Sequence, residues 1–218
     1  MPTWRATTCG ADPNGHIYTQ QILRRLNSQD PEMSVFAGYV HQGIGRMQTL
    51  IQDLLTYSRT VQRNEVLVGT ADLSASLAEA VSVLRNRIEE SGAVVHAEPL
   101  PTVRGETAQV AHVFQNLLSN AIKYRKPESI PEIHIRAERD GTQWVVSIKD
   151  NGIGFEQKYA ERIFGLFKRL HTNEYPGTGL GLAICQRTIE RYGGRMWAHG
   201  QPGEGATVFF TIAAIDAQ

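Results

Sequence analysis

The chain has 218 residues, enough for one large domain or two small ones, and 22 Lys plus Arg balance 22 Asp plus Glu. The zero net charge gives no electrostatic reason to expect nucleic acid or an anionic membrane as partner, although it leaves room for a local basic pocket. There is no membrane-spanning apolar run, no apolar core of a secretory signal and no CxxC pair from Cys9 and Cys185, so we expect a cytoplasmic protein.

The N-terminal part is predicted to be helical after a short lead. Residues 1–16 are rich in Thr, Gly, Pro and Asn and are expected to be poorly ordered. A short helix is predicted over 17–27. Asp30 then suits an N-cap and Pro31 the first helical position, so a long helix is expected from there to about residue 62.

Apolar residues recur along this long helix at spacings of three or four. The seam consists of Phe36, Val40, Ile44, Met47, Ile51, Leu54 and Ser58. A helix of this length is not stable alone, so the seam needs a partner. An intramolecular hairpin and half of a dimeric four-helix bundle both fit the pattern, and the pattern does not choose between them. We assign residues 17–63 to this helical hairpin.

From residue 64 to 218 the pattern changes to mixed α/β. Strands are expected over 65–69, 94–98, 102–104, 132–139, 143–149, 195–199 and 206–212, and helices over 72–90, 107–124 and 181–192. Tight turns join the later strands, Asp140-Gly141 being the clearest. The predicted fold class is therefore α+β, with helices on one face of a mixed sheet.

Three polar residues share one stripe of the helix predicted over 107–124. Asn116, Asn120 and Lys123 stand at i, i+4 and i+7, beside the apolar face. Amide oxygens suit Mg²⁺ and an ammonium suits phosphate, so the stripe is a candidate phosphate and metal site. Taken alone, an ordinary solvated helix face explains it better.

Two glycine-rich segments follow. Asp150-Asn151-Gly152-Ile153-Gly154-Phe155 comes directly after a strand, where a carboxylate can accept a hydrogen bond from an exocyclic amine such as that of adenine, although a plain Asx turn also fits. Gly177-Thr178-Gly179-Leu180-Gly181-Leu182 opens a helix, and N–H groups at a helix N-terminus favour phosphate. This second segment matches neither the Walker loop nor the dinucleotide fingerprint.

The segment between the glycine-rich stretches, 155–176, is predicted to be a lid. It contains the apolar anchors Phe164 and Phe167 and the basic residues Lys168 and Arg169, with glycines on both sides as hinges. Each motif alone is ambiguous, but their order along one chain is not.

In that order, the motifs resemble the boxes of bacterial sensor histidine kinases of the phytochrome-like type. FQNLLSNAIKYR resembles the N box, DNGIGF the first glycine box, RIFGLFKRLH the F box and GTGLGLAI the second glycine box. The resemblance covers about residues 31–213. It implies an α/β sandwich ATPase domain of the histidine kinase, gyrase and Hsp90 type, which binds ATP and Mg²⁺ and transfers phosphoryl groups in two-component signalling.

The resemblance also implies a role for each matching residue. Asn120 would hold Mg²⁺, Asn116 and Lys123 would lie at the phosphates as the catalytic pair, and Asp150 would bind the adenine amine. The other ATP-binding positions would be Tyr124, Gly152, Gly154, Phe164, Lys168, Gly177, Thr178, Gly179, Leu180, Gly181 and Thr207. Related ATPases that hydrolyse ATP have a general-base Glu at the position of Asn116, and an amide cannot take a proton. Phosphoryl transfer to a protein side chain is therefore favoured over hydrolysis.

The N-terminal half departs from the family pattern. None of the seven histidines precedes an acidic residue, and the family's phosphoacceptor would fall near Ala6. His16 and His41 are the remaining candidates, and a structural role is the more ordinary explanation for each. A histidine kinase with a homodimeric hairpin and a response-regulator partner is the first hypothesis. An ATP-binding dimerisation or docking module without its own acceptor, and a Ser/Thr kinase of the anti-sigma-factor type, are the alternatives; the long helix and the F box argue against the last.

Overall fold

The computed structural model describes residues 31–62, 69–170, 175 and 177–215. The chain divides into two compact units, Met1–Thr49 and Leu50–Gln218, and the division falls inside the first described helix. The segment expected to be poorly ordered, 1–16, and the short helix expected over 17–27 both lie outside the described residues. The hairpin therefore remains a prediction, because only the helix proposed as its second arm lies among the described residues. The domain boundary predicted at residues 63–64 also remains a prediction.

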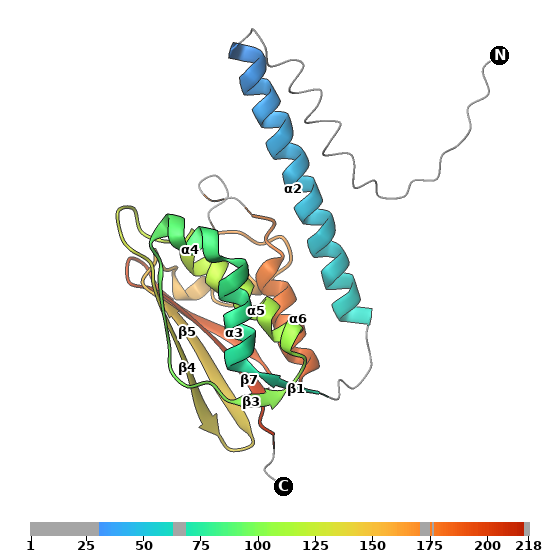
Figure 1. Ribbon diagram of the computed structural model, residues 1–218, viewed down its shortest axis with the longest axis vertical. Coiled ribbons are helices and arrows are strands. Elements are labelled where there is room, and N and C mark those ends of the chain that lie inside the picture. The colour runs from blue at the N-terminus through green and yellow to red at the C-terminus, as the bar shows by residue number, and fades with distance from the viewer. Residues whose placement is uncertain (1–30, 63–68, 171–174, 176, 216–218) are drawn as a thin grey trace, which may run out of the picture. The chain divides into compact units, whose positions relative to one another are not determined.

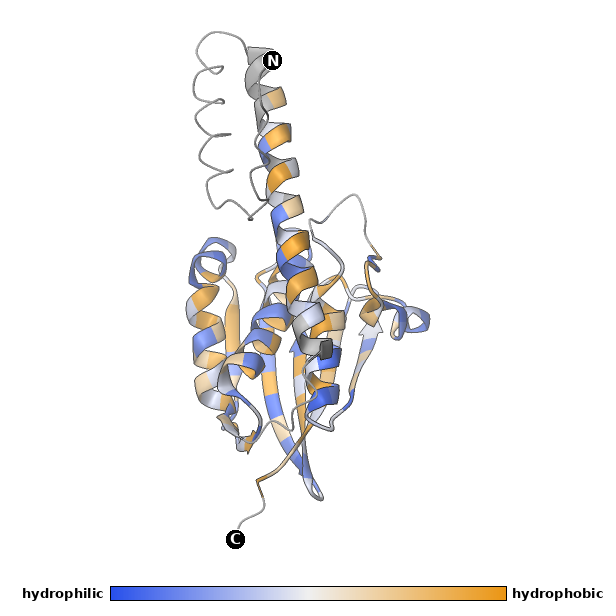
Figure 2. Cartoon of the chain, turned by 90° about the vertical axis from the view of Figure 1, so that its right-hand side faces the viewer, coloured by the Kyte–Doolittle hydropathy of each residue, from blue (hydrophilic) through white to orange (hydrophobic). Residues whose placement is uncertain are grey.

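Helix α2, Pro31–Gln62, has the bounds that the cap and the spacing predict. Figure 2 shows apolar residues recurring along it. Large apolar side chains on α2 remain exposed to solvent, namely Phe36, Tyr39, Val40, Met47, Ile51, Leu54 and Leu55. This helix therefore has an apolar seam without a partner in the described part of a single chain. No helix among the described residues is both long enough and apolar enough to cross a membrane.

A five-stranded mixed sheet in the order β2-β4-β5-β7-β6 forms the frame of the second unit. Its strands are β2 (Val94–Ala97), β4 (Glu132–Asp140), β5 (Gln143–Asp150), β6 (Met196–Gln201) and β7 (Gly205–Ala213). β2 pairs in parallel with β4, and every other pair is antiparallel. The predicted hairpin turn joins β4 to β5, with Gly141 at a φ of 58°.

Helices cover one face of this sheet (Figure 1). They are α3 (Leu73–Val83), α4 (Arg85–Ser91), α5 (Thr107–Lys123) and α6 (Gly181–Arg191), and two 3₁₀ turns, η1 (Gln157–Tyr159) and η2 (Arg162–Phe164), lie in the segment before α6. Asp72 caps α3 through hydrogen bonds from the backbone N–H groups of Ser74 and Ala75 at 2.8 and 3.2 Å. The single helix expected over 72–90 is two helices, because the chain leaves helical geometry at Leu84 (φ −92°, ψ 5°).

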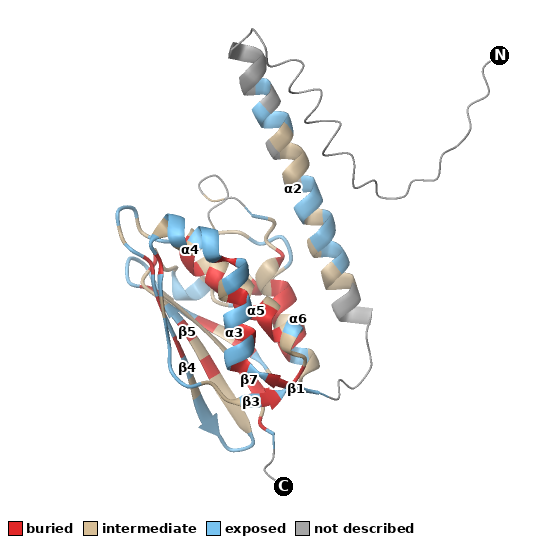
Figure 3. Cartoon of the chain, in the orientation of Figure 1, coloured by how far each residue is buried: buried red, intermediate tan, exposed pale blue. Residues whose placement is uncertain are grey.

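The core lies between the helices and the sheet, where Figure 3 shows the buried residues gathered. The apolar face predicted for α5 is buried in full, from Val110 to Ile122. A second, two-stranded sheet pairs β1 (Thr70–Asp72) with β3 (Thr102–Arg104). Of the strand expected over 65–69, residues 65–68 lie outside the described part, and the first described strand, β1, begins at Thr70. The predicted α+β fold, with helices on one face of a mixed sheet, is confirmed.

Candidate functional site

A cavity opens between α5, the end of β5 and the segment that follows β5. It is lined by Leu117, Asn120, Ala121, Tyr124, Ile148, Asp150, Ile153, Gly154, Phe155, Ile163, Lys168, Arg169, Leu170, Leu182, Ala206 and Val208. Most of these side chains are apolar. A few polar groups in a mostly apolar cavity are typical of a small-molecule site, in which apolar contact supplies affinity and polar groups fix orientation.

Asp150 stands at the end of β5 with one carboxylate oxygen already engaged. Its Oδ1 accepts hydrogen bonds from the backbone N–H of Gly152 at 2.9 Å and of Ala206 at 3.1 Å. Within the described part of the chain its other oxygen, Oδ2, accepts no hydrogen bond. The carboxylate is therefore held in a fixed orientation with one acceptor left for a ligand.

Burial raises the pKa of Asp150, and the two backbone hydrogen bonds oppose that shift. A carboxylate in this position gains from a donor that satisfies its second oxygen, because an unpaired polar atom in a low-dielectric cavity is costly. An amino group of a ligand would supply such a donor.

The turn after Asp150 requires glycines because other backbone passes against it. A Cβ on Gly152 would lie 2.5 Å from the carbonyl oxygen of Tyr124, and a Cβ on Gly154 would lie 2.0 Å from that of Gln201. Gly154 also has a φ of 64°. The backbone N–H of Gly203 donates to the carbonyl of Ile153 at 2.7 Å. The turn is thus joined to the end of α5 on one side and to the β6–β7 turn on the other.

Lys123 lies at the C-terminal end of α5 and meets the second glycine-rich segment. Its Nζ would be 3.2 Å from a Cβ on Gly177, and it lies 4.1 Å from the centroid of the Tyr124 ring. Burial, with the positive charges of Arg169 and Arg87, lowers the pKa of Lys123 to about 8. An anionic ligand would stabilise the charged form of the Lys123 ammonium group and raise its pKa back toward the ordinary value.

Asn116 and Asn120 keep to the predicted stripe of α5 but differ in surroundings. Asn120 lines the cavity. Asn116 donates from Nδ2 to the carbonyl of His112 at 3.0 Å, and its Oδ1 would lie 2.6 Å from a Cβ on Gly181. Asn116 therefore packs against the start of α6, where a glycine is required. Among the described residues no cluster of three or more His, Cys, Asp or Glu could hold a metal.

Several other predicted positions reach the same region. Tyr124 and Lys168 line the cavity, and the Tyr124 ring lies 5.0 Å from that of Tyr175. The hydroxyl of Thr178 accepts a hydrogen bond from the backbone N–H of Leu180 at 3.3 Å. Leu180 is fully buried, and its N–H is already engaged by the Thr178 hydroxyl.

Of the predicted positions, the cavity lining contains neither Phe164 nor Thr207, and the other predicted positions that do not line it are Asn116, Lys123, Gly152 and residues 177–181. Phe164 is buried in the hydrophobic core. Thr207 pairs with Lys149 and His199 in the sheet, on the face opposite to Ala206 and Val208, which line the cavity. Asp150 is supported by the backbone N–H of Ala206, and no side-chain motif in the sequence marks that group.

Sequence reasoning also missed most of the apolar lining. Leu117, Ala121, Ile148 and Val208 belong to helix and strand patterns that indicate a core position, and Leu182 and Ile163 are partly buried beside it. Periodicity identifies such residues as inward-facing but does not separate core from cavity wall.

Comparison with known proteins agrees with this geometry. The family of histidine kinase-, DNA gyrase B- and HSP90-like ATPases matches residues 105–215. The chain belongs to this family. The prediction of a sensor-histidine-kinase type of catalytic domain with an ATPase fold is confirmed.

The relatives and solved structures extend the likeness to most of the chain. Cyanobacterial phytochrome A of Nostoc sp. strain PCC 7120 is 45% identical over 197 residues, which is 89% of this chain and 26% of that protein. The chain thus spans about a quarter of the length of this relative. The structure of full-length ShkA in complex with AMPPNP has a TM-score of 0.69 at 23% identity, over 92% of this chain and 46% of that one. Histidine kinase ThkA in complex with response regulator protein TrrA has a TM-score of 0.67 at 21% identity, over 93% of this chain and 58% of that one.

Proposed function

We propose that this chain binds Mg-ATP and donates its γ-phosphoryl group to a protein histidine in two-component signal transduction. The observation that carries the proposal is the state of Asp150. One of its oxygens is held by two backbone N–H groups, and the other has no hydrogen-bond partner among the described residues, in a cavity with mostly apolar walls. This arrangement suits the exocyclic amine of adenine.

The phosphate end is proposed to lie between α5 and the second glycine-rich segment. Lys123 beside Gly177 supplies a cation, and the backbone N–H groups at the start of α6 supply neutral donors. Asn120 would offer one amide oxygen to Mg²⁺, with the remaining ligands from phosphate oxygens and water. Such a shared site needs no carboxylate cluster. Asn116 and Lys123 would act by position and charge.

Transfer to a protein side chain is favoured over hydrolysis by the amide at position 116. Nδ2 of Asn116 donates a hydrogen bond to the carbonyl of His112, and the amide oxygen of Asn116 does not accept a proton from an attacking water. Catalysis then rests on alignment of the phosphates and on charge neutralisation. The acceptor histidine is proposed to be supplied by another chain, because no histidine of this sequence is followed by an acidic residue.

Two partners belong to the same proposal. The exposed apolar seam of α2, which includes Phe36, Met47 and Leu54, is proposed to pair with a second copy of the chain in a homodimer. A response-regulator receiver domain is proposed to take the phosphoryl group, and the complex of ThkA with TrrA supports this choice. The site of action is proposed to be the cytoplasm.

Incubation with γ-labelled Mg-ATP tests the proposed transfer. We expect acid-labile, alkali-stable label on a separately added hairpin that carries a histidine followed by an acidic residue. Nucleotide binding is measured in parallel by calorimetry. Binding without any transferred label, even to the added acceptor, would contradict the kinase function and leave an ATP-binding module.

A further inference from the structure

One strand at the edge of the large sheet is completed by a side chain. β6 is the last strand in the order, so it pairs with β7 on one side only. On its other side the carboxamide of Gln157 donates from Nε2 to the carbonyl of Ala198 at 3.3 Å and accepts at Oε1 from the N–H of Gly200 at 3.0 Å. One amide thus satisfies two outward-facing backbone groups that a neighbouring strand would otherwise satisfy.

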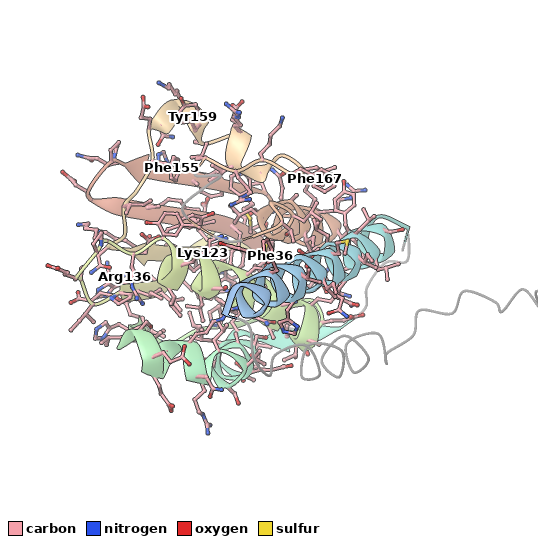
Figure 4. The ribbon with its side chains drawn as sticks, turned by 90° about the horizontal axis from the view of Figure 1, so that it is seen from above. Phe36, Lys123, Arg136, Phe155, Tyr159 and Phe167 are labelled. Atoms are coloured by element: carbon pink, nitrogen blue, oxygen red, sulfur yellow. The ribbon has the colours of Figure 1, made fainter. Side chains whose placement is uncertain are left out.

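The same stretch of β6 receives the ring of Phe155. A Cβ on Gly200 would lie 2.6 to 2.7 Å from Cδ1, Cδ2 and Cε1 of Phe155. The ring therefore lies flat against the bare backbone of Gly200 and cannot do so once a side chain is added there. Phe155 lines the cavity directly after Gly154, at the end that contains Asp150, whereas Lys123 comes from α5 (Figure 4).

The neighbours of Gln157 have no comparable attachment. Glu156 and Lys158 form an ion pair with each other at 2.6 Å, with more than half of each side chain exposed. Surface pairs of this kind contribute little to stability. Gln157 is thus the residue of the η1 turn that ties this stretch to the sheet, two positions after the ring that forms the wall.

We propose that Gln157 is a positioning residue for the adenosine part of the nucleotide: by holding the start of the segment after β5 to the free edge of β6, it keeps the Phe155 ring against Gly200. The inference rests on the proposed nucleotide binding. Gln157 lies outside the four motifs that carry the family resemblance. A change of Gln157 is expected to weaken the binding of ATP and ADP alike, because both contain adenosine.

Two variants of Gln157 separate its hydrogen bonds from its bulk. Gln157→Ala removes both, while Gln157→Met keeps the length and removes only the hydrogen bonds. We expect both to weaken ADP and ATP binding by the same factor, roughly three- to tenfold, because two partly exposed hydrogen bonds are lost. The rate of phosphoryl transfer to the added hairpin at saturating ATP should stay unchanged, since the residues proposed to bind the phosphates are not altered. Lys158→Ala, in the same turn, is the matched control and should bind like the parent.

Gly200→Ala tests the other half of the contact. Gly200 has an ordinary φ, so alanine adds only the clash with the Phe155 ring. It should weaken ADP and ATP equally. The double variant with Gln157→Ala should be less than additive, because both changes free the same ring. Calorimetric titration with ADP and with ATP measures the affinities of the parent, the two single variants and the double variant, and thermal unfolding confirms that each variant is folded.

The outcomes separate this inference from the function on which it rests. Parent-like ADP affinity in folded Gln157→Ala and Gln157→Met overturns the positioning role alone. A loss for ATP with none for ADP also overturns it, because the effect would then lie at the phosphates. A parent chain that binds neither nucleotide overturns the proposed function, and this inference with it.

Discussion

The two ends of the proposed nucleotide site, around Asp150 and around Lys123, are built in opposite ways. Around Asp150 the backbone is held together without a ligand, by hydrogen bonds from Gly152 and Ala206 and by glycines that fit against the end of α5 and the β6–β7 turn. Around Lys123, burial and then the positive charges of Arg169 and Arg87 lower the pKa of the ammonium group. The end proposed to hold adenine is therefore preorganised by geometry, and the end proposed to hold the phosphates is prepared by electrostatics.

The largest effect is expected at the metal ligand of the phosphate end. Asn120→Ala should abolish Mg-dependent ATP binding, because the amide oxygen proposed to hold Mg²⁺ is removed. Calorimetry with ATP, with and without Mg²⁺, measures the change. Asn86→Ala, an exposed asparagine of α4, is the control. A variant that keeps the Mg²⁺-dependent gain in affinity would show that Asn120 is not the ligand.

Rigidity of the adenine end is tested most severely at Gly154. Gly154→Ala places a Cβ against the carbonyl of Gln201 at a φ of 64°, so we expect the free energy of unfolding to fall by about 3 kcal/mol. Gly203→Ala is the control in the adjoining turn, because its φ of 80° is also positive but its Cβ would meet nothing within 4 Å. That variant should lose about 1 kcal/mol. Equal losses by denaturant unfolding would refute the close approach.

The reading of the base is tested at Asp150. Asp150→Asn keeps an acceptor for the two backbone N–H groups and turns the free oxygen into a donor that faces the adenine amine. ATP affinity should fall about 10- to 100-fold, the cost of one unsatisfied buried polar contact. The variant should also lose its preference for ATP over GTP. Asp140→Asn, in the exposed β4–β5 turn, is the control. If Asp150→Asn distinguishes ATP from GTP as the parent does, another group reads the base.

Much of the frame follows from sequence because each element carries its own local signal. Asp30 and Pro31 predict the start of α2, the apolar periodicity of α5 predicts its buried face, and Asp140-Gly141 predicts the β4–β5 hairpin. The boxes locate Asp150, Asn120 and Lys123 for a similar reason, since each combines an unusual residue type with a fixed spacing.

The supports of the site do not follow from sequence, because they join residues far apart in the chain through groups that every residue has. The N–H of Ala206 and the carbonyls of Tyr124 and Gln201 leave no mark in the residue type. The residue type of Gln157 does not reveal its role either, because its hydrogen-bond partner on the edge of β6 is distant in the sequence. The break at Leu84 is likewise marked by no Pro or Gly in the sequence.

The smallest expected effect separates charge from geometry at the phosphate end. Lys123 has a pKa lowered to about 8, and phosphate binding favours its charged form, so the pKa rises in the complex. ATP affinity should therefore be constant below about pH 8 and fall as the pH rises above it, with about three quarters of a proton taken up per nucleotide at pH 8.5. Titrations in buffers of different ionisation enthalpy measure this uptake.

Lys123→Arg is the control for that titration, because a guanidinium stays charged throughout the range. Two neighbouring groups do not titrate near pH 8, since burial raises the pKa of Tyr124 and lowers that of His112. The variant should bind ATP with no proton uptake and a flat pH profile. If it shows the same decline above pH 8 as the parent, Lys123 is not the titrating group, and the contrast between the two ends of the proposed nucleotide site loses its electrostatic half.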